Sequence, residues 1–129
     1  MSDKGYEKTQ EEILKERAEV LFRTGRMLSD AINRARDIEK DIDEKMNMLN
    51  DRVRNGYVDS INGLCRDIDE QINQFNEARE YAKIRYYYLI VTREAMGFRR
   101  HAWVENIYRI PNKKKNLKRN QWTGMQNEG

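Results

Sequence analysis

An apolar residue recurs at every seventh position over most of this chain. The first series is Leu14, Leu21, Leu28, Ala35, Ile42 and Leu49, and the second is Ile61, Ile68, Phe75, Ala82, Leu89 and Met96. A period of seven, with further apolar residues three or four positions away, places one apolar stripe along each of two long helices. We call these stripes the first and the second seam. They predict an all-α, coiled-coil-like protein with helical arms over about residues 7–54 and 58–96.

The link between the two arms is short. It contains Asn55–Gly56, two residues that tolerate a positive φ. Such a link predicts an antiparallel helical hairpin, with each arm about 60 Å long. Gly25 lies on the flank of the first seam, where glycine costs about 1 kcal/mol in a helix, and Ser29 could cap a new start. The sequence therefore predicts a bend near Gly25, which would divide the hairpin into three helices.

The chain changes character at Gly97, because glycine ends or kinks a helix. The stretch FRRHAWVENIYRI (98–110) has apolar residues on one side and is closed by Pro111, which is typical of a short amphipathic helix. We therefore divide the chain into a helical hairpin (1–96), a short amphipathic helix (97–110) and a basic, flexible tail (111–129).

The composition agrees with extended helices rather than with a deep single core. Charged residues make up 36% and hydrophobic residues 38% of the chain, with one proline. A two-helix hairpin buries only one narrow stripe per arm, yet Phe22, Met27, Met48 and the run YYYLIV (86–91) are apolar outside the seams. These residues predict a homo-oligomer, or pairing with a related helical chain.

Several classes of protein and site are not expected. Cys65 is the only cysteine, which excludes an internal disulfide and favours an intracellular or virion setting. We expect no signal peptide and no membrane span. His101 is the only histidine, and no nucleotide-binding or hydrolase motif occurs. We therefore expect no enzyme activity, no catalytic residues, no metal site and no cofactor.

The positive charge is concentrated at one end of the sequence. Residues 97–129 carry 8 cations against 2 anions, whereas residues 1–56 and 57–96 have net charges of −1 and −2. Cations gathered in this way can neutralise phosphates, and aromatic side chains among them can stack on bases. The predicted phosphate contacts are Arg93, Arg99, Arg100, Arg109, Lys113, Lys114, Lys115, Lys118 and Arg119, with Trp122 as a stacking group.

The architecture resembles that of the small helical coat proteins with which filamentous archaeal viruses wrap their DNA. The resemblance rests on the helical pair 14–54 and 58–96 followed by the basic stretch FRRHAWVENIYRIPNKKKNLKR. It implies DNA packaging without base reading, by a protein that dimerises through extended helices. The expected partner is nucleic acid, with duplex DNA preferred, and the expected function is sequence-independent packaging.

Three other interpretations stay open. The basic tail could only keep the protein soluble, and Arg79 and Lys83 could be ion-paired with neighbouring glutamates. The hairpin could be a coiled-coil adaptor or scaffold that binds a partner protein. The chain also resembles small phage transcription regulators, with HAWVENIYRI as the first helix of a helix-turn-helix. The second helix would then fall in PNKKKNLKRNQW, which has only Leu117 and Trp122 to dock it.

Overall fold

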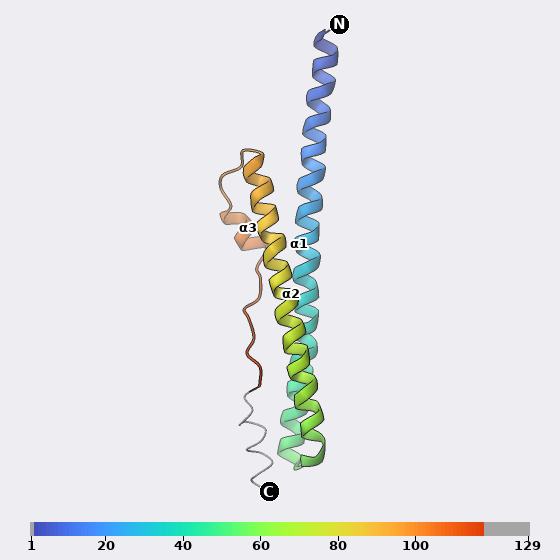
Figure 1. Cartoon of the computed structure of the whole chain (residues 1–129), viewed down its shortest axis with the longest axis vertical. Coiled ribbons are helices and arrows are strands. Elements are labelled where there is room, and N and C mark those ends of the chain that lie inside the picture. The colour runs from blue at the N-terminus through green and yellow to red at the C-terminus, as the bar shows by residue number, and fades with distance from the viewer. Residues whose placement is uncertain (1, 118–129) are drawn as a thin grey trace.

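The protein is an elongated pair of helices with a third, irregular layer on one side (Figure 1). The computed structural model describes the backbone of residues 2–117, and the side chains of residues 9–117 except residue 58. Its elements are α1 (Ser2–Asn55), a short 3-10 helix η1 (Val58–Ser60), α2 (Ile61–Ala95) and α3 (Ala102–Ile107). The described part of the chain contains no strand, so the all-α prediction is confirmed.

The two long helices pack through the predicted seams. From the first seam Leu28, Ala35, Ile42 and Leu49 are buried, whereas Leu14 remains 64% exposed. The reason is that α1 is longer than α2, and its N-terminal end projects beyond the C-terminal end of α2 (Figure 1). We call the projecting part of α1 the overhang. It leaves the start of the first seam without a partner within the described chain.

The turn between α1 and α2 is built on Gly56, which has a φ of 76°. The Gly56 amide donates to Val53 O at 3.2 Å and the Tyr57 amide to Arg52 O at 3.0 Å. Ser60 precedes α2 but makes no side-chain cap. Its hydroxyl lies 3.3 Å from Tyr57 O instead, which closes the turn.

The predicted bend near Gly25 is wrong. Helix α1 continues without interruption from Ser2 to Asn55, so the hairpin region is not divided into three helices. Gly25 serves a close approach: a Cβ at this position would lie 3.0 Å from the Tyr108 hydroxyl. The glycine makes room for the chain that follows α3, rather than relaxing the backbone of α1.

Gly97 ends α2 as predicted, with a φ of 95°. The Phe98 amide donates to Arg93 O at 2.9 Å and the Gly97 amide to Glu94 O at 3.0 Å, which together form a Schellman motif. Residues 98–101 complete this corner and are not helical. The third helix is therefore shorter than the predicted 98–110.

The core consists of two clusters along the helix pair. The cluster nearer the turn contains Ile42, Leu49, Ile68 and Phe75, with Leu117 packed against it. The cluster nearer the overhang contains Leu28, Leu89 and Val104 of α3, with Tyr108 and Ile110 packed against it. Residues from the C-terminal third thus complete both clusters.

Candidate nucleic-acid interface

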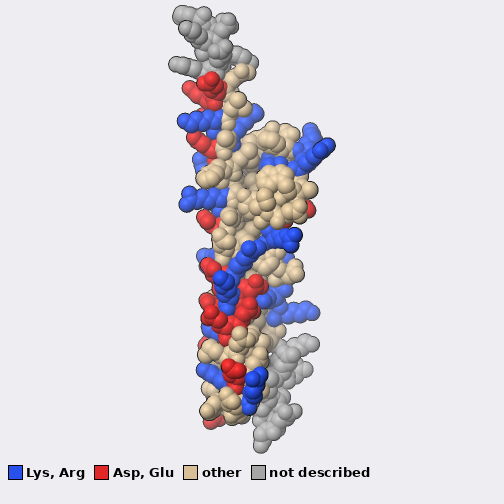
Figure 2. Space-filling model, turned by 180° about the vertical axis from the view of Figure 1, so that it is seen from behind, with Lys and Arg blue, Asp and Glu red and all other residues tan. Residues whose placement is uncertain are grey.

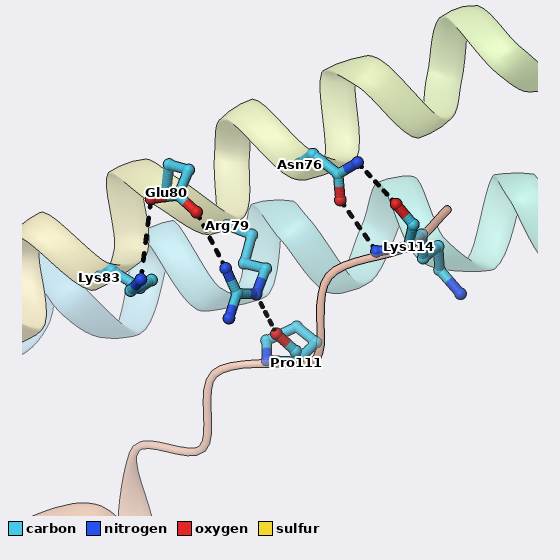
Figure 3. A network of polar contacts seen from close by, with 6 residues as sticks. All are labelled: Asn76, Arg79, Glu80, Lys83, Pro111 and Lys114. Atoms are coloured by element: carbon cyan, nitrogen blue, oxygen red, sulfur yellow. Dashed lines mark hydrogen bonds and ion pairs between the residues drawn. The ribbon is translucent and has the colours of Figure 1, made fainter. Parts of the chain in front are cut away.

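Residues 109–117, which we call the strap, run back along the helix pair in an extended conformation (Figure 1). The sequence predicted a flexible tail from Pro111 onward, but the structure holds residues 111–117 against α2. Arg79 Nε donates to Pro111 O at 2.8 Å. The Asn76 amide group donates to Lys114 O at 2.9 Å and accepts from Lys114 N at 3.0 Å (Figure 3). Polar side chains of α2 therefore satisfy the strap backbone.

Further contacts fix both ends of the strap. Arg36 Nη2 of α1 donates to Arg109 O at 3.2 Å. At the other end Leu117 N donates to Asp69 Oδ1 at 2.7 Å, and Asn116 Nδ2 donates to Asn73 Oδ1 at 3.0 Å. The strap is thus held mainly by α2, with contacts to α1 at Arg109 and Lys114.

From Pro111 to Leu117, every third side chain of the strap faces the helix pair. Pro111, Lys114 and Leu117 are partly buried, whereas Lys113 and Lys115 are exposed. This is the period of a polyproline II helix, which has three residues per turn. The strap therefore turns one lysine inward and leaves its two neighbours in solvent.

Lys114 is engaged within the chain. Its Nζ lies 3.2 Å from Glu39 Oε2 and 5.4 Å from the centroid of the Phe75 ring. An ammonium that is paired with a carboxylate and placed over an aromatic ring has little to gain from a phosphate. We therefore leave Lys114 out of the candidate interface.

Arg93 is also engaged, because it holds the corner between α2 and α3. It is 8% exposed, and its guanidinium carbon lies 5.0 Å from the Phe98 ring centroid and 4.7 Å from that of Trp103. Nη2 donates to Arg100 O at 3.0 Å, and Nε donates to His101 Nδ1 at 3.3 Å. Since Nδ1 accepts, Nε2 of His101 carries the proton toward Glu94 Oε1 at 3.2 Å.

The remaining predicted cations of the described chain are available. Arg99, Arg100, Arg109, Lys113 and Lys115 are exposed, and none of them forms an ion pair within residues 9–117. Figure 2 shows Lys and Arg side chains projecting from both edges of the molecule, while Asp and Glu are most numerous over the lower half of the helix pair. Lys118, Arg119 and Trp122 lie outside the described residues.

Arg79 and Lys83 belong to an ion-paired cluster. Glu80 lies 2.9 Å from Arg79 Nη1 and 3.9 Å from Lys83 Nζ (Figure 3). The ion-paired interpretation of these two cations is therefore correct. Arg79 has a second use that the sequence did not reveal, which is the hydrogen bond to the strap.

Sequence reasoning missed an aromatic cluster around Arg85. The Arg85 guanidinium carbon lies 5.1 Å from the Tyr81 ring centroid and 5.8 Å from that of Tyr88, and Nε donates to the Tyr81 hydroxyl at 2.9 Å. The i, i+4 spacing of Tyr81 and Arg85 is the signal that could have indicated it. Tyr86 instead packs on the core, and burial, with a smaller effect of the Glu105 carboxylate, raises its pKa.

The described residues offer no group of three or more metal-ligating side chains. No helix among them is long and apolar enough to cross a membrane. Comparison of the chain with protein-family models, with curated proteins and with solved structures gave no match.

Proposed function

We propose that the protein binds nucleic acid, preferentially duplex DNA, through its phosphate backbone and without reading the sequence. The proposed role is structural, as in packaging or coating a genome, in an intracellular or virion setting and without catalysis. The proposed contacts are the five exposed cations of the corner and the strap, namely Arg99, Arg100, Arg109, Lys113 and Lys115. This is the kind of function that the resemblance to filamentous-virus coat proteins implies.

The observation that carries the proposal is the docked strap. It holds Lys113 and Lys115 in solvent on a backbone that is already fixed by Asn76 and Arg79. A fixed backbone loses less conformational entropy on binding than a free tail would. From Arg109 to Lys115 the strap extends over roughly 20 Å, which is enough to reach several phosphates of a duplex.

The strap also bears on the regulator alternative. A helix-turn-helix needs a second helix after the first, and α3 ends at Ile107. Within the described chain the residues that follow form the strap, and α3 has only six residues. Recognition by a helix in the major groove is therefore less favoured than backbone binding.

The arrangement of the helices is a finer part of the proposal. We propose that α1 and α2 form an antiparallel hairpin of the coiled-coil type. Buried residues from both seams, such as Ile42 and Ile68 in one cluster, support it. A hairpin of this kind supplies a stiff rod along which the strap cations are spaced.

The proposal predicts a steep salt dependence. With five phosphate contacts, log K for duplex DNA should fall with log salt concentration at a slope of about −4.5. The double variant Lys113→Gln/Lys115→Gln should bind more weakly to every sequence, and its slope should be smaller by about 2. Fluorescence anisotropy at several salt concentrations measures both quantities.

A matched control distinguishes the strap from net charge alone. Arg54→Gln/Arg66→Gln removes the same number of exposed cations from the helix pair, outside the corner and the strap. This control should leave the slope close to that of the unmodified protein. Equal losses in the two double variants would contradict a specific role of the strap.

A second candidate function is that of an adaptor or scaffold. It is favoured by the large apolar side chains that remain exposed around the overhang, such as Leu14 at 64% and Phe22 at 71%. An adaptor would bind its partner through these residues, with little dependence on salt. Absence of DNA binding at 50 mM salt would favour this function over the first.

A further inference from the structure

The exposed apolar side chains are concentrated in the half of the rod that contains the overhang. Among the side chains that the structure describes, the exposed large hydrophobic residues other than Met48, Val53 and Tyr57 belong to residues 13–27 of α1, to residues 81–98 in the C-terminal half of α2 and the corner, or to α3. Soluble monomers seldom expose so many large apolar side chains in one region. This half of the rod therefore has the character of an interface.

One groove between α1 and α2 is filled and the other is open. The strap occupies the flank of α2 that carries Asn76 and Arg79. On the opposite flank lies an uncovered cavity of about 320 Å³. Its lining residues are Ala31 and Arg34 of α1 and Gln74, Glu77, Ala78 and Tyr81 of α2. The open groove is therefore bordered by both long helices.

A stripe on α1 leads along the overhang into this open groove. Ile13, Val20 and Met27 are spaced by seven residues and are 42%, 38% and 37% exposed. Met27 and Ala31 are four residues apart and so lie on the same face of α1, and Ala31 lines the cavity. Each chain thus has one unpartnered apolar stripe and one open groove, on the same side.

The charges along α1 indicate which partner fits. Residues 11–19 contain Glu11, Glu12, Glu16 and Glu19 against Lys15 and Arg17, a net charge of −2. Residues 23–34 contain Arg23, Arg26 and Arg34 against Asp30, a net charge of +2. A second copy in antiparallel orientation brings the acidic segment of each chain beside the basic segment of the other, whereas a parallel copy brings like charges together.

We propose that the partner is a second copy of this chain, packed antiparallel with a two-fold axis near Val20. Ile13 of each copy then lies beside Met27 of the other, and each overhang enters the open groove of the other copy. Such an interface is isologous, so one surface supplies both halves. Because it uses the flank opposite the strap, the dimer leaves Lys113 and Lys115 exposed. The inference does not depend on nucleic-acid binding.

Position 20 provides the first test. Val20→Glu introduces a charge at an exposed site, which the monomer tolerates, but at the proposed axis two unpaired carboxylates would meet. Sedimentation equilibrium should show a dimer for the unmodified protein and a dimerisation constant weaker by roughly a hundredfold for Val20→Glu. Met48→Glu, at a residue that is 46% exposed on the turn half of the rod, is the matched control and should leave the constant unchanged.

A cross-link tests the position of the axis. Val20→Cys should form a disulfide between two copies under mild oxidation, whereas Met48→Cys should not. Cys65 is 1% exposed and should not contribute. Circular dichroism shows whether each variant keeps its helices.

Charge reversal tests the antiparallel orientation. Glu12→Arg/Glu16→Arg should weaken the dimer, and adding Arg23→Glu/Arg26→Glu to the same chain should restore it. A monomer at about 100 µM would overturn the proposal. A dimer that survives Val20→Glu, a Val20→Cys chain that does not cross-link, or a charge reversal without rescue would each overturn it as well. If Lys113→Gln/Lys115→Gln loses DNA binding but still dimerises, the result bears on the proposed nucleic-acid binding and leaves the proposed dimer unaffected.

Discussion

At the scale of single residues, Gly25 shows how a glycine in a helix can be misread. The sequence predicted a bend there, because glycine destabilises a helix interior and Ser29 follows four residues later. The structure instead places the Tyr108 hydroxyl against the position that a Cβ would occupy. This contact joins residues 83 positions apart in the sequence. No local pattern in the sequence reports such a contact.

The role of Gly25 can be measured with a double-mutant cycle. Alanine gains about 1 kcal/mol of helix propensity over glycine. In a Tyr108→Phe background, Gly25→Ala should therefore raise the free energy of unfolding by about that amount. With Tyr108 present, the gain should be smaller or reversed, because the new methyl group meets the hydroxyl. Urea unfolding of the four chains gives the coupling energy, and a coupling of zero would refute the close-approach explanation.

Cys65 links stability to pH. Burial, and to a lesser extent the Asp69 carboxylate, raises the pKa of its thiol. The unfolded chain therefore loses the thiol proton at a lower pH than the folded chain does. The contribution of this thiol to the free energy of unfolding is fully present below the ordinary thiol pKa of about 8.5. It is lost as the pH rises above that value, by up to about 1.4 kcal/mol per pH unit.

Unfolding experiments between pH 7.5 and 9.5 test this dependence. The free energy of unfolding should fall over this pH range. In Cys65→Ala this decrease should be smaller, however much the substitution itself changes the free energy of unfolding at pH 7.5. An unchanged slope in Cys65→Ala would assign the pH dependence to other groups, such as Tyr86, whose pKa is also raised.

At the scale of elements, the two long helices could be predicted because their signal is periodic. Each seam contains six apolar residues at seven-residue spacing, so the period would remain recognisable after a single substitution. The exposure along the seam could not be predicted. Leu14 and Ile42 occupy equivalent positions of the first seam, yet they are 64% and 3% exposed. The difference depends on where α2 ends relative to α1, which the period does not encode.

The docking of the strap could not be predicted either, for a different physical reason. Asn76 and Arg79 of α2 donate to backbone carbonyl groups of the strap, and every strap residue has a carbonyl. Recognition through backbone atoms leaves no pattern of side-chain types in the strap. For the same reason the sequence could not separate Lys114, which is ion-paired, from Lys113 and Lys115.

Asn76 is the residue that should release the strap when changed. Asn76→Ala removes two hydrogen bonds to the Lys114 backbone, at a cost of about 1–3 kcal/mol for docking. The amides of Lys114 and Leu117, which donate to Asn76 and Asp69, should then exchange faster with solvent deuterium, while those of α1 and α2 keep their protection. The exposed Asn33→Ala is the control. Loss of protection throughout the helix pair would instead mean that the strap and the helices unfold together.

At the scale of the whole molecule, the two ends of the rod differ. The turn end buries its seam residues and exposes few large apolar groups. The overhang end carries exposed aromatic and aliphatic side chains on α1, α2 and α3. The sequence predicted an oligomer from the number of apolar residues outside the seams, but only the structure locates them at one end. Their location is the reason that the antiparallel dimer proposed above joins the two copies through their overhang ends.

The single short turn at Gly56 also has a consequence for the order of folding. Contacts near the turn, such as those of Leu49 with α2, close small loops, whereas Val104 reaches Leu28 only across the greater part of the chain. Because closing a longer loop costs more entropy, the contacts between α1 and α2 should form first at the turn and then progressively toward the overhang. Stopped-flow measurements should then show that Leu49→Ala mainly slows folding and that Val104→Ala mainly speeds unfolding. The opposite assignment would place the nucleus at the α3 corner.

With a nucleus at the turn, the corner and the strap are the last parts to form and the first to open. Local unfolding of the folded rod therefore begins at the two segments that carry the exposed cations proposed to bind phosphate.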